Sequence, residues 1–149
     1  MKKLIGILII TMLFILVGCS KDEITKHDYT YKGENDLWTA EYNVKGQSGF
    51  IKKGDRQIHS SNSNSKLTVT YKKDLADLPL VKNLNISYKS SVHDMTNTTK
   101  FDKNTALDKK TFIIEDTSKD SPIEKKDETI KVTIDIDGNT QTLDLKSVN

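Results

Sequence analysis

Residues 129–145 read TIKVTIDIDGNTQTLDL, and this stretch decides the fold. Its apolar residues occupy every second position as far as Ile136, and the alternation resumes at Leu143 after an Asp-Gly-Asn interruption. A period of two places successive side chains on opposite faces of a strand. Asp-Gly and Gly-Asn pairs accept positive φ, so the chain can reverse there with little strain. The pattern therefore predicts a β-hairpin with one buried and one solvated face.

The same period recurs in three segments nearer the N-terminus. Residues 37–45, 66–72 and 84–88 each alternate apolar with polar side chains, and each predicts a half-buried strand. Residues 111–115 differ, because they carry Phe-Ile-Ile in succession. Such a run is expected for a strand that is covered on both faces or twists between layers.

Polar connections separate these segments. Residues 60–65 read SSNSNS, and residues 116–127 are polar and include Pro122, so both stretches predict exposed loops. The one candidate helix is short and runs from Lys73 to Leu80, with Asp74 as its capping residue.

Six to eight short strands with polar connections predict an all-β fold. We expect an antiparallel two-layer sandwich, immunoglobulin-like only in its loose architecture, with a small open barrel as the alternative. The chain contains 1 Cys, so it lacks the Cys-Trp-Cys spacing of true immunoglobulin domains. Trp38 is expected to be a core aromatic.

The first twenty residues, MKKLIGILIITMLFILVGCS, indicate where the protein is located. Lys2 and Lys3 form a basic start, residues 4–17 are apolar, and the small Gly18 precedes Cys19. The apolar run is shorter than the roughly 20 residues of a membrane span, and an ordinary secretory signal makes no demand on a cysteine. The segment resembles the lipobox of bacterial lipoproteins. This resemblance implies cleavage between Gly18 and Cys19 and a diacylglycerol on Cys19.

Removal of residues 1–18 leaves 131 residues, enough for one compact domain. We predict a signal peptide at 1–18, a lipid-anchored tether at 19–27 and a β-sandwich domain at 28–149. Both lysines that give the chain its formal charge of +2 lie in the leader, so the expected mature protein is neutral. Neutrality gives no general electrostatic argument for nucleic acid or anionic lipid as a partner.

Residues 31–38 contain the motif aromatic-x-Gly-Glu-x-x-x-Trp, from Tyr31 to Trp38. With the leader and the terminal hairpin, the motif resembles small uncharacterised lipoproteins of Bacillus-type Firmicutes. The likeness covers the leader, residues 29–44 and residues 128–146, and it implies a lipid-anchored exported domain without implying a particular activity.

Two interpretations of this motif are open. In the first, Gly33 forms a turn that other residues cannot adopt, and the following polar side chains cap backbone groups. In the second, Glu34 and Trp38 border a shallow ligand groove at one end of the sandwich.

Metal and cofactor sites are not predicted. Residues 135–139, DIDGN, lack the glycine and glutamate spacing of a calcium-binding EF-hand and are better explained as a hairpin turn. The three histidines, His27, His59 and His93, are too far apart in sequence to form a local metal-binding pair.

An enzyme is not predicted either. The chain contains no GxSxG or HExxH motif and no glycine-rich phosphate loop. His93-Asp94 is the only candidate for part of a catalytic triad, and nothing in the sequence specifies a serine to complete it.

The sequence therefore predicts a lipid-anchored, extracytoplasmic binding or scaffolding module at the outer face of the plasma membrane. Its membrane contact is the Cys19 lipid, and its expected partner is a membrane or cell-wall protein. A tether from Cys19 to Lys26 reaches at most ~25 Å, which keeps the domain near the bilayer. The alternative is a lipoprotein that captures a small ligand or wall fragment for a transporter.

Overall fold

The computed structural model describes residues 23–149, which form eight strands and one 3₁₀ turn, η2 (Leu75–Asp77). The strands are β1 (Glu23–Glu34), β2 (Trp38–Lys53), β3 (Arg56–Tyr71), β4 (Val81–Lys89), β5 (Asp94–Thr105), β6 (Thr111–Lys119), β7 (Thr129–Ile136) and β8 (Asn139–Ser147). The predicted all-β fold is therefore confirmed for this part of the chain.

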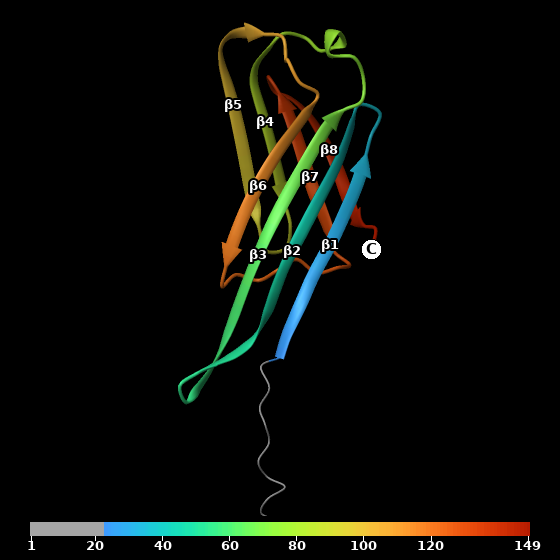
Figure 1. Cartoon of the computed structure of the whole chain (residues 1–149). Helices are drawn as coiled ribbons and strands as arrows, with labels where there is room; N and C mark the ends of the chain where they lie inside the picture. Colours follow the sequence, from blue (N-terminus) through green and yellow to red (C-terminus); the bar gives the residue numbers. More distant parts are fainter. Residues whose placement is uncertain (1–22) are drawn as a thin grey trace, which may run out of the picture.

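The strands form one sheet in the order β5-β4-β7-β8-β1-β2-β3-β6, and every pairing is antiparallel. The sheet folds over, so that β1, β2, β3 and β6 face β4, β5, β7 and β8 across the core (Figure 1). The two halves are joined where β1 meets β8, at Tyr31↔Ser147 and Lys32↔Lys146. The outermost strands, β5 and β6, leave the sheet nearly closed, so it resembles an open barrel as well as a sandwich.

Alternate side chains of the strands point inward and form one hydrophobic core. Trp38 is 2 % exposed and packs against Tyr71 with ring centroids 5.0 Å apart, as expected for a core aromatic. The largest buried side chains are Trp38, Tyr31, Tyr42, Tyr88, Leu67 and Leu84. A core this rich in aromatics provides much of the buried apolar area that stabilises the sheet.

The predicted C-terminal hairpin is confirmed as β7 and β8. Its two-residue turn is Asp137-Gly138, with φ values of 51° and 88°. Positive φ at both central positions is the requirement of a type I′ turn, whose twist matches that of the strands. We call the end of the sheet that holds this turn the distal end, and the end where β1 begins the proximal end.

The prediction of an exposed loop at residues 60–65 is wrong, because β3 runs straight through it. Ser61, Ser63 and Ser65 are buried and alternate with exposed residues. Small serine side chains fill the inward face of β3 at residues 61–65, because the segment after β6 passes close to this face. The Ser61 hydroxyl donates to the Ser121 carbonyl of that segment at 2.6 Å.

The prediction of an exposed loop at residues 116–127 is also wrong in part. Residues 116–119 complete β6, and Glu124 is 1 % exposed. This carboxylate is buried because the connection between β6 and β7 closes the proximal end of the core.

Two further local predictions need correction. Ile113 lies on the edge strand β6 and is exposed, so residues 111–115 are not covered on both faces. The candidate helix at 73–80 is reduced to the three residues of η2, and Asp74 makes no side-chain capping bond.

Strand β1 begins at Glu23 and pairs with β2 from its first residue, so it includes residues 23–27 of the predicted tether. The predicted signal peptide and the lipidation site Cys19 lie outside the described residues. Among residues 23–149, no helix is long and apolar enough to span a bilayer.

Candidate functional site

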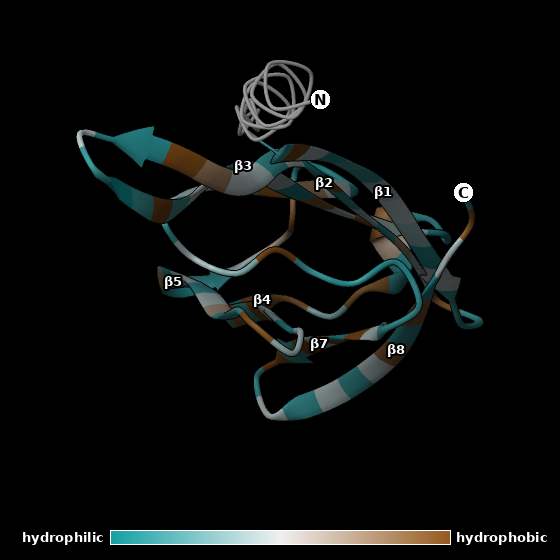
Figure 2. Ribbon diagram, turned by 90° about the horizontal axis from the view of Figure 1, so that it is seen from below, coloured by the Kyte–Doolittle hydropathy of each residue, from teal (hydrophilic) through white to brown (hydrophobic). Residues whose placement is uncertain are grey.

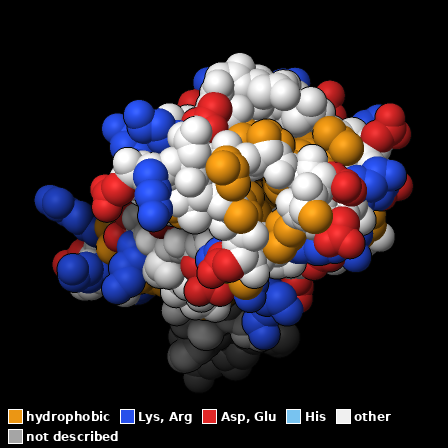
Figure 3. Space-filling view, turned by 90° about the horizontal axis from the view of Figure 1, so that it is seen from above, with side chains coloured by type: hydrophobic (Ala, Val, Ile, Leu, Met, Phe, Trp, Pro, Cys, Tyr) orange, Lys and Arg blue, Asp and Glu red, His pale blue; other side chains and the backbone are white. Residues whose placement is uncertain are grey.

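An apolar pocket opens at the distal end of the sheet. Its walls come from β2, β3, β7 and the segment after η2, and its apolar lining includes Trp38, Tyr71, Leu78, Leu80, Ile134 and Ile136. Asp137, Asn139 and Gln141 provide polar groups at its border. Figure 3, which views this end directly, shows hydrophobic side chains gathered at the centre of the face with charged side chains around them. We call this hollow the distal pocket.

Local structure explains why these residues meet. Asn35 turns the chain between β1 and β2, because its Oδ1 accepts hydrogen bonds from the backbone N–H groups of Leu37 and Trp38 at 2.9 and 2.8 Å. Pro79 follows η2, and an extended backbone there carries Leu80 out over the pocket. Leu80 is 57 % exposed, although leucine side chains are usually buried.

The volume of the distal pocket, about 240 Å³, limits what it can hold. Pockets for drug-sized ligands usually measure about 300–1,000 Å³. A single aliphatic or aromatic side chain fits the smaller space. Such a contact is typical of an anchor residue at a protein–protein interface.

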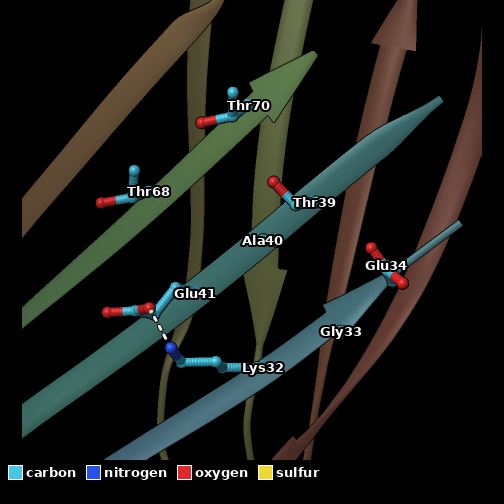
Figure 4. Close-up of a pocket in the computed structure, with 8 residues that line it drawn as sticks. All are labelled: Lys32, Gly33, Glu34, Thr39, Ala40, Glu41, Thr68 and Thr70. Atoms are coloured by element: carbon cyan, nitrogen blue, oxygen red, sulfur yellow. Dashed lines mark ion pairs between the residues drawn. The ribbon is translucent and has the colours of Figure 1, made fainter. Parts of the chain in front are cut away.

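Glu34 and Trp38, which the sequence suggested as neighbours in one groove, line different hollows. Glu34 lies on the outer face of β1, in a polar hollow of about 590 Å³ with Lys32, Glu41, Thr68 and Thr70 (Figure 4). Lys32 and Glu41 form an ion pair of 2.9 Å across it. Trp38 lines the distal pocket from inside the core.

Each conspicuous residue of the motif at residues 31–38 has a structural role. The Tyr31 hydroxyl donates to the Lys125 carbonyl at 2.7 Å, and Glu34 pairs with Lys72 at 3.2 Å. Gly33 lies within β1, not in a turn, and a Cβ there would lie 2.7 Å from the Asp144 carbonyl oxygen. Glycine is therefore needed because β8 passes so close, which corrects the expected reason.

A third hollow, of about 390 Å³, lies between β5 and β6, the outermost strands of the described sheet. Its apolar lining includes Ile86, Phe101, Leu107, Phe112 and Ile114, and Asn97, Thr99 and Lys109 add polar groups. We call it the seam cleft. Its volume falls within the range of small-molecule pockets.

The proximal end contains a buried polar cluster that sequence reasoning missed. Glu124 Oε1 accepts hydrogen bonds from the Tyr42 hydroxyl at 2.7 Å and the Ser90 hydroxyl at 3.2 Å, and it lies 2.9 Å from His93 Nδ1. His93 Nε2 lies 3.0 Å from the Ser118 hydroxyl. Burial, together with the nearby Glu124 carboxylate, raises the pKa of Tyr42 well above its usual range. We call these five residues the proximal cluster.

His93 is thus oriented by Glu124 and not by its neighbour Asp94, which pairs with Lys89 at 3.2 Å. The hydroxyl–imidazole–carboxylate series resembles a catalytic triad in its hydrogen bonding. The Ser118 hydroxyl, however, donates its one hydrogen to Asp116 on the same edge strand at 3.4 Å, and Ser118 lines neither the distal pocket nor the seam cleft. The arrangement is therefore best explained as a structural network.

The acidic residues of the β7–β8 turn bind backbone groups. Asp137 accepts hydrogen bonds from the N–H groups of Lys82 and Asn83 at 3.0 and 2.7 Å, which lower the pKa of its carboxyl. Asp135 accepts one from the Gly138 N–H at 3.1 Å. Within residues 23–149, no three His, Cys, Asp or Glu side chains cluster so as to hold a metal ion.

No known family matches. The chain also finds no match among curated proteins or solved structures.

Proposed function

We propose that the chain is a lipid-anchored binding module at the outer face of the bacterial plasma membrane, and that its distal pocket receives an apolar side chain of a membrane or cell-wall protein. The observation that supports this function is the apolar lining of the pocket, whose floor is formed by buried core residues and whose border carries the exposed Leu80. Isolated apolar side chains are common on protein surfaces, but a concave group of them marks an interaction site.

The position of the pocket agrees with an anchor at Cys19. Strand β1 begins at the opposite end of the sheet from the distal pocket (Figure 1). A lipid attached four residues before Glu23 would therefore leave the pocket facing away from the bilayer, toward the wall and neighbouring proteins.

The anchor is tested with a Cys19→Ser variant of the full-length chain. This variant is expected to keep its leader and lack lipid, since the thiol is the acyl acceptor. Mass spectrometry of the protein from the membrane fraction measures both properties. Normal processing and lipid modification of the variant would refute the anchor.

The pocket is tested by crosslinking on intact cells. A photo-reactive residue at Leu80 is expected to capture one defined protein, whereas the same group at the exposed Thr98 on β5 is not. Leu80→Asp should then weaken binding of the purified partner at least tenfold, because loss of a buried aliphatic anchor costs roughly 1.5–3 kcal/mol. Leu80 is largely exposed, so this variant should unfold at nearly the same urea concentration as the unmodified chain.

The seam cleft favours a second function, capture of a small ligand or wall fragment. Phe101 and Phe112 give it aromatic walls, and polar groups at its border could orient a ligand. Failure to crosslink at Leu80, combined with binding of a wall fragment that Phe101→Ala abolishes, would favour this alternative.

A further inference from the structure

The β2–β3 hairpin extends beyond the rest of the sheet at the proximal end (Figure 1). Strand β1 begins opposite Phe50, and β6 ends opposite Asn62. Among residues 23–149, those from Ile51 to Ile58 pair only with one another, and a two-residue turn at Gly54-Asp55 closes the hairpin. We call residues 50–59 the hairpin tip.

The hairpin tip exposes apolar side chains on both faces. Ile51 and Ile58 are opposite one another on one face, and Ile24 of β1 lines a small hollow with Ile51. Phe50 stacks edge-on against His59 on the other face, with ring centroids 5.6 Å apart. Phe50 is 49 % exposed and Ile24 is 51 % exposed. Figure 2, viewed from this end, shows hydrophobic bands on both arms of the hairpin.

The hairpin tip also has a net positive charge. Lys52, Lys53 and Arg56 flank the turn, all are exposed, and Asp55 is the only acid among them. The neutral balance of the chain after residue 18 therefore conceals a local positive cluster. Basic residues beside exposed aliphatic and aromatic groups are the combination that binds the interface of an anionic bilayer.

Chain length brings this tip to the membrane. Glu23 lies four positions after Cys19, and four residue steps span at most about 14 Å. The hairpin continues past Glu23 for three residue pairs and the turn, which is about 13 Å at the rise of a β-strand. A lipid on Cys19 thus holds the start of β1 at most about 14 Å from the bilayer, a distance close to the length of the tip.

We propose that the hairpin tip is a second membrane contact, which inserts Phe50, Ile51 and Ile58 at the interface of an anionic outer leaflet and places Lys52, Lys53 and Arg56 among its phosphates. This inference rests on the proposed lipid anchor. Two contacts fix the orientation of the domain, so that the distal pocket points away from the membrane. One acyl anchor alone leaves the domain free to tilt.

The test uses protein that begins at Ser20, since all the strands that the structure describes lie within residues 23–149 and residues 20–149 contain no cysteine. Asp55→Cys carries an environment-sensitive nitrobenzoxadiazole dye, and vesicles contain phosphatidylglycerol and phosphatidylcholine at 1:3. Dye emission is expected to rise and shift to the blue with these vesicles, and to change less with pure phosphatidylcholine. The same dye on Lys73→Cys, after β3 at the distal end, should not respond.

A charge comparison shows whether the basic cluster is responsible. Neutralising the tip with K52Q, K53Q and R56Q is expected to weaken partitioning on the order of 100-fold, from about 1 kcal/mol for each basic residue near an anionic surface. The matched variant K73Q, K103Q and K110Q removes three exposed lysines elsewhere and should change partitioning less than threefold.

Three results would overturn the proposal: no response of the dye at position 55, equal effects of the two triple variants, or a response that depends on protein concentration without vesicles. The last result would show that a second copy occupies the tip. Refutation of the lipid anchor can be told apart from refutation of the hairpin tip as a membrane contact. The lipid on Cys19 is measured from the mass of the full-length protein, whereas the vesicle experiment uses protein from Ser20, which carries no lipid.

Discussion

Replacing Glu124 by alanine tests whether this carboxylate holds the proximal end of the core together. Its Oε1 accepts hydrogen bonds from the Tyr42 and Ser90 hydroxyls and contacts His93, and its side chain is fully buried. In the unmodified chain the His93 side chain is partly exposed to solvent, whereas Tyr42 is fully buried. The main effect should therefore come from Tyr42.

The magnitude follows from two losses. An unpaired buried hydroxyl costs about 1–3 kcal/mol, and the one methylene group that alanine lacks, Cγ of Glu124, contributes ~0.8 kcal/mol by burial. We expect Glu124→Ala to lower the free energy of unfolding by about 2–4 kcal/mol. Tyr42→Phe alone should lower it by about 1.5–3 kcal/mol, the value of one hydrogen bond to a charged group.

Equilibrium urea unfolding measures these values. Trp38 is the only tryptophan and is buried, so its fluorescence reports unfolding of the core. Glu115→Ala is the matched control, because Glu115 is exposed and forms only a surface ion pair with Lys66 at 3.4 Å; its cost should stay below about 1 kcal/mol.

The decisive comparison is a double-mutant cycle. If Tyr42 acts through Glu124, Tyr42→Phe should cost almost nothing in the Glu124→Ala background. An equal cost in both backgrounds would refute the reasoning, as would a Glu124→Ala protein within 1 kcal/mol of the unmodified chain.

Two further predictions concern the strand contacts and the β7–β8 turn. Gly33→Ala should lower the free energy of unfolding by about 1–3 kcal/mol, because a methyl group forces β8 away from β1; unchanged stability in urea would show that β8 moves freely. Asp137 has a lowered pKa, so its contribution to stability is complete above the unfolded-state value of about 3.9 and is lost as the pH falls through the folded-state value. The stability difference between the unmodified chain and Asp137→Asn should therefore narrow as the pH falls below about 4, and a difference that stays constant between pH 2 and pH 6 in urea titrations would contradict this role.

Much of the fold follows from local sequence. Alternation around Trp38, Leu67, Ile86 and Val132 predicts strands, because a period of two separates a core face from a solvent face wherever a strand lies on a core. The Asp-Gly pair fixes the last turn for an equally local reason, since few residues adopt positive φ. These features need no knowledge of what lies across the sheet.

The candidate sites depend on contacts between distant segments. Glu124 and the serines of residues 60–65 look solvent-exposed in sequence, and only the closing of the β6–β7 connection over the proximal end buries them. The sequence suggested one groove for Glu34 and Trp38, but strand direction sends one side chain outward and the other into the core.

The sequence by itself determined the alternating segments of β2, β3, β4, β7 and β8, the C-terminal turn and the case for a lipid at Cys19, because each is encoded in neighbouring residues; it did not predict β1 or β5. Only the tertiary structure decided where the distal pocket, the proximal cluster and the hairpin tip lie. The positions of these sites depend on which strand ends lie together and on how far the β2–β3 hairpin extends beyond the neighbouring strands. Pairing between strands across the whole sheet determines both of these features.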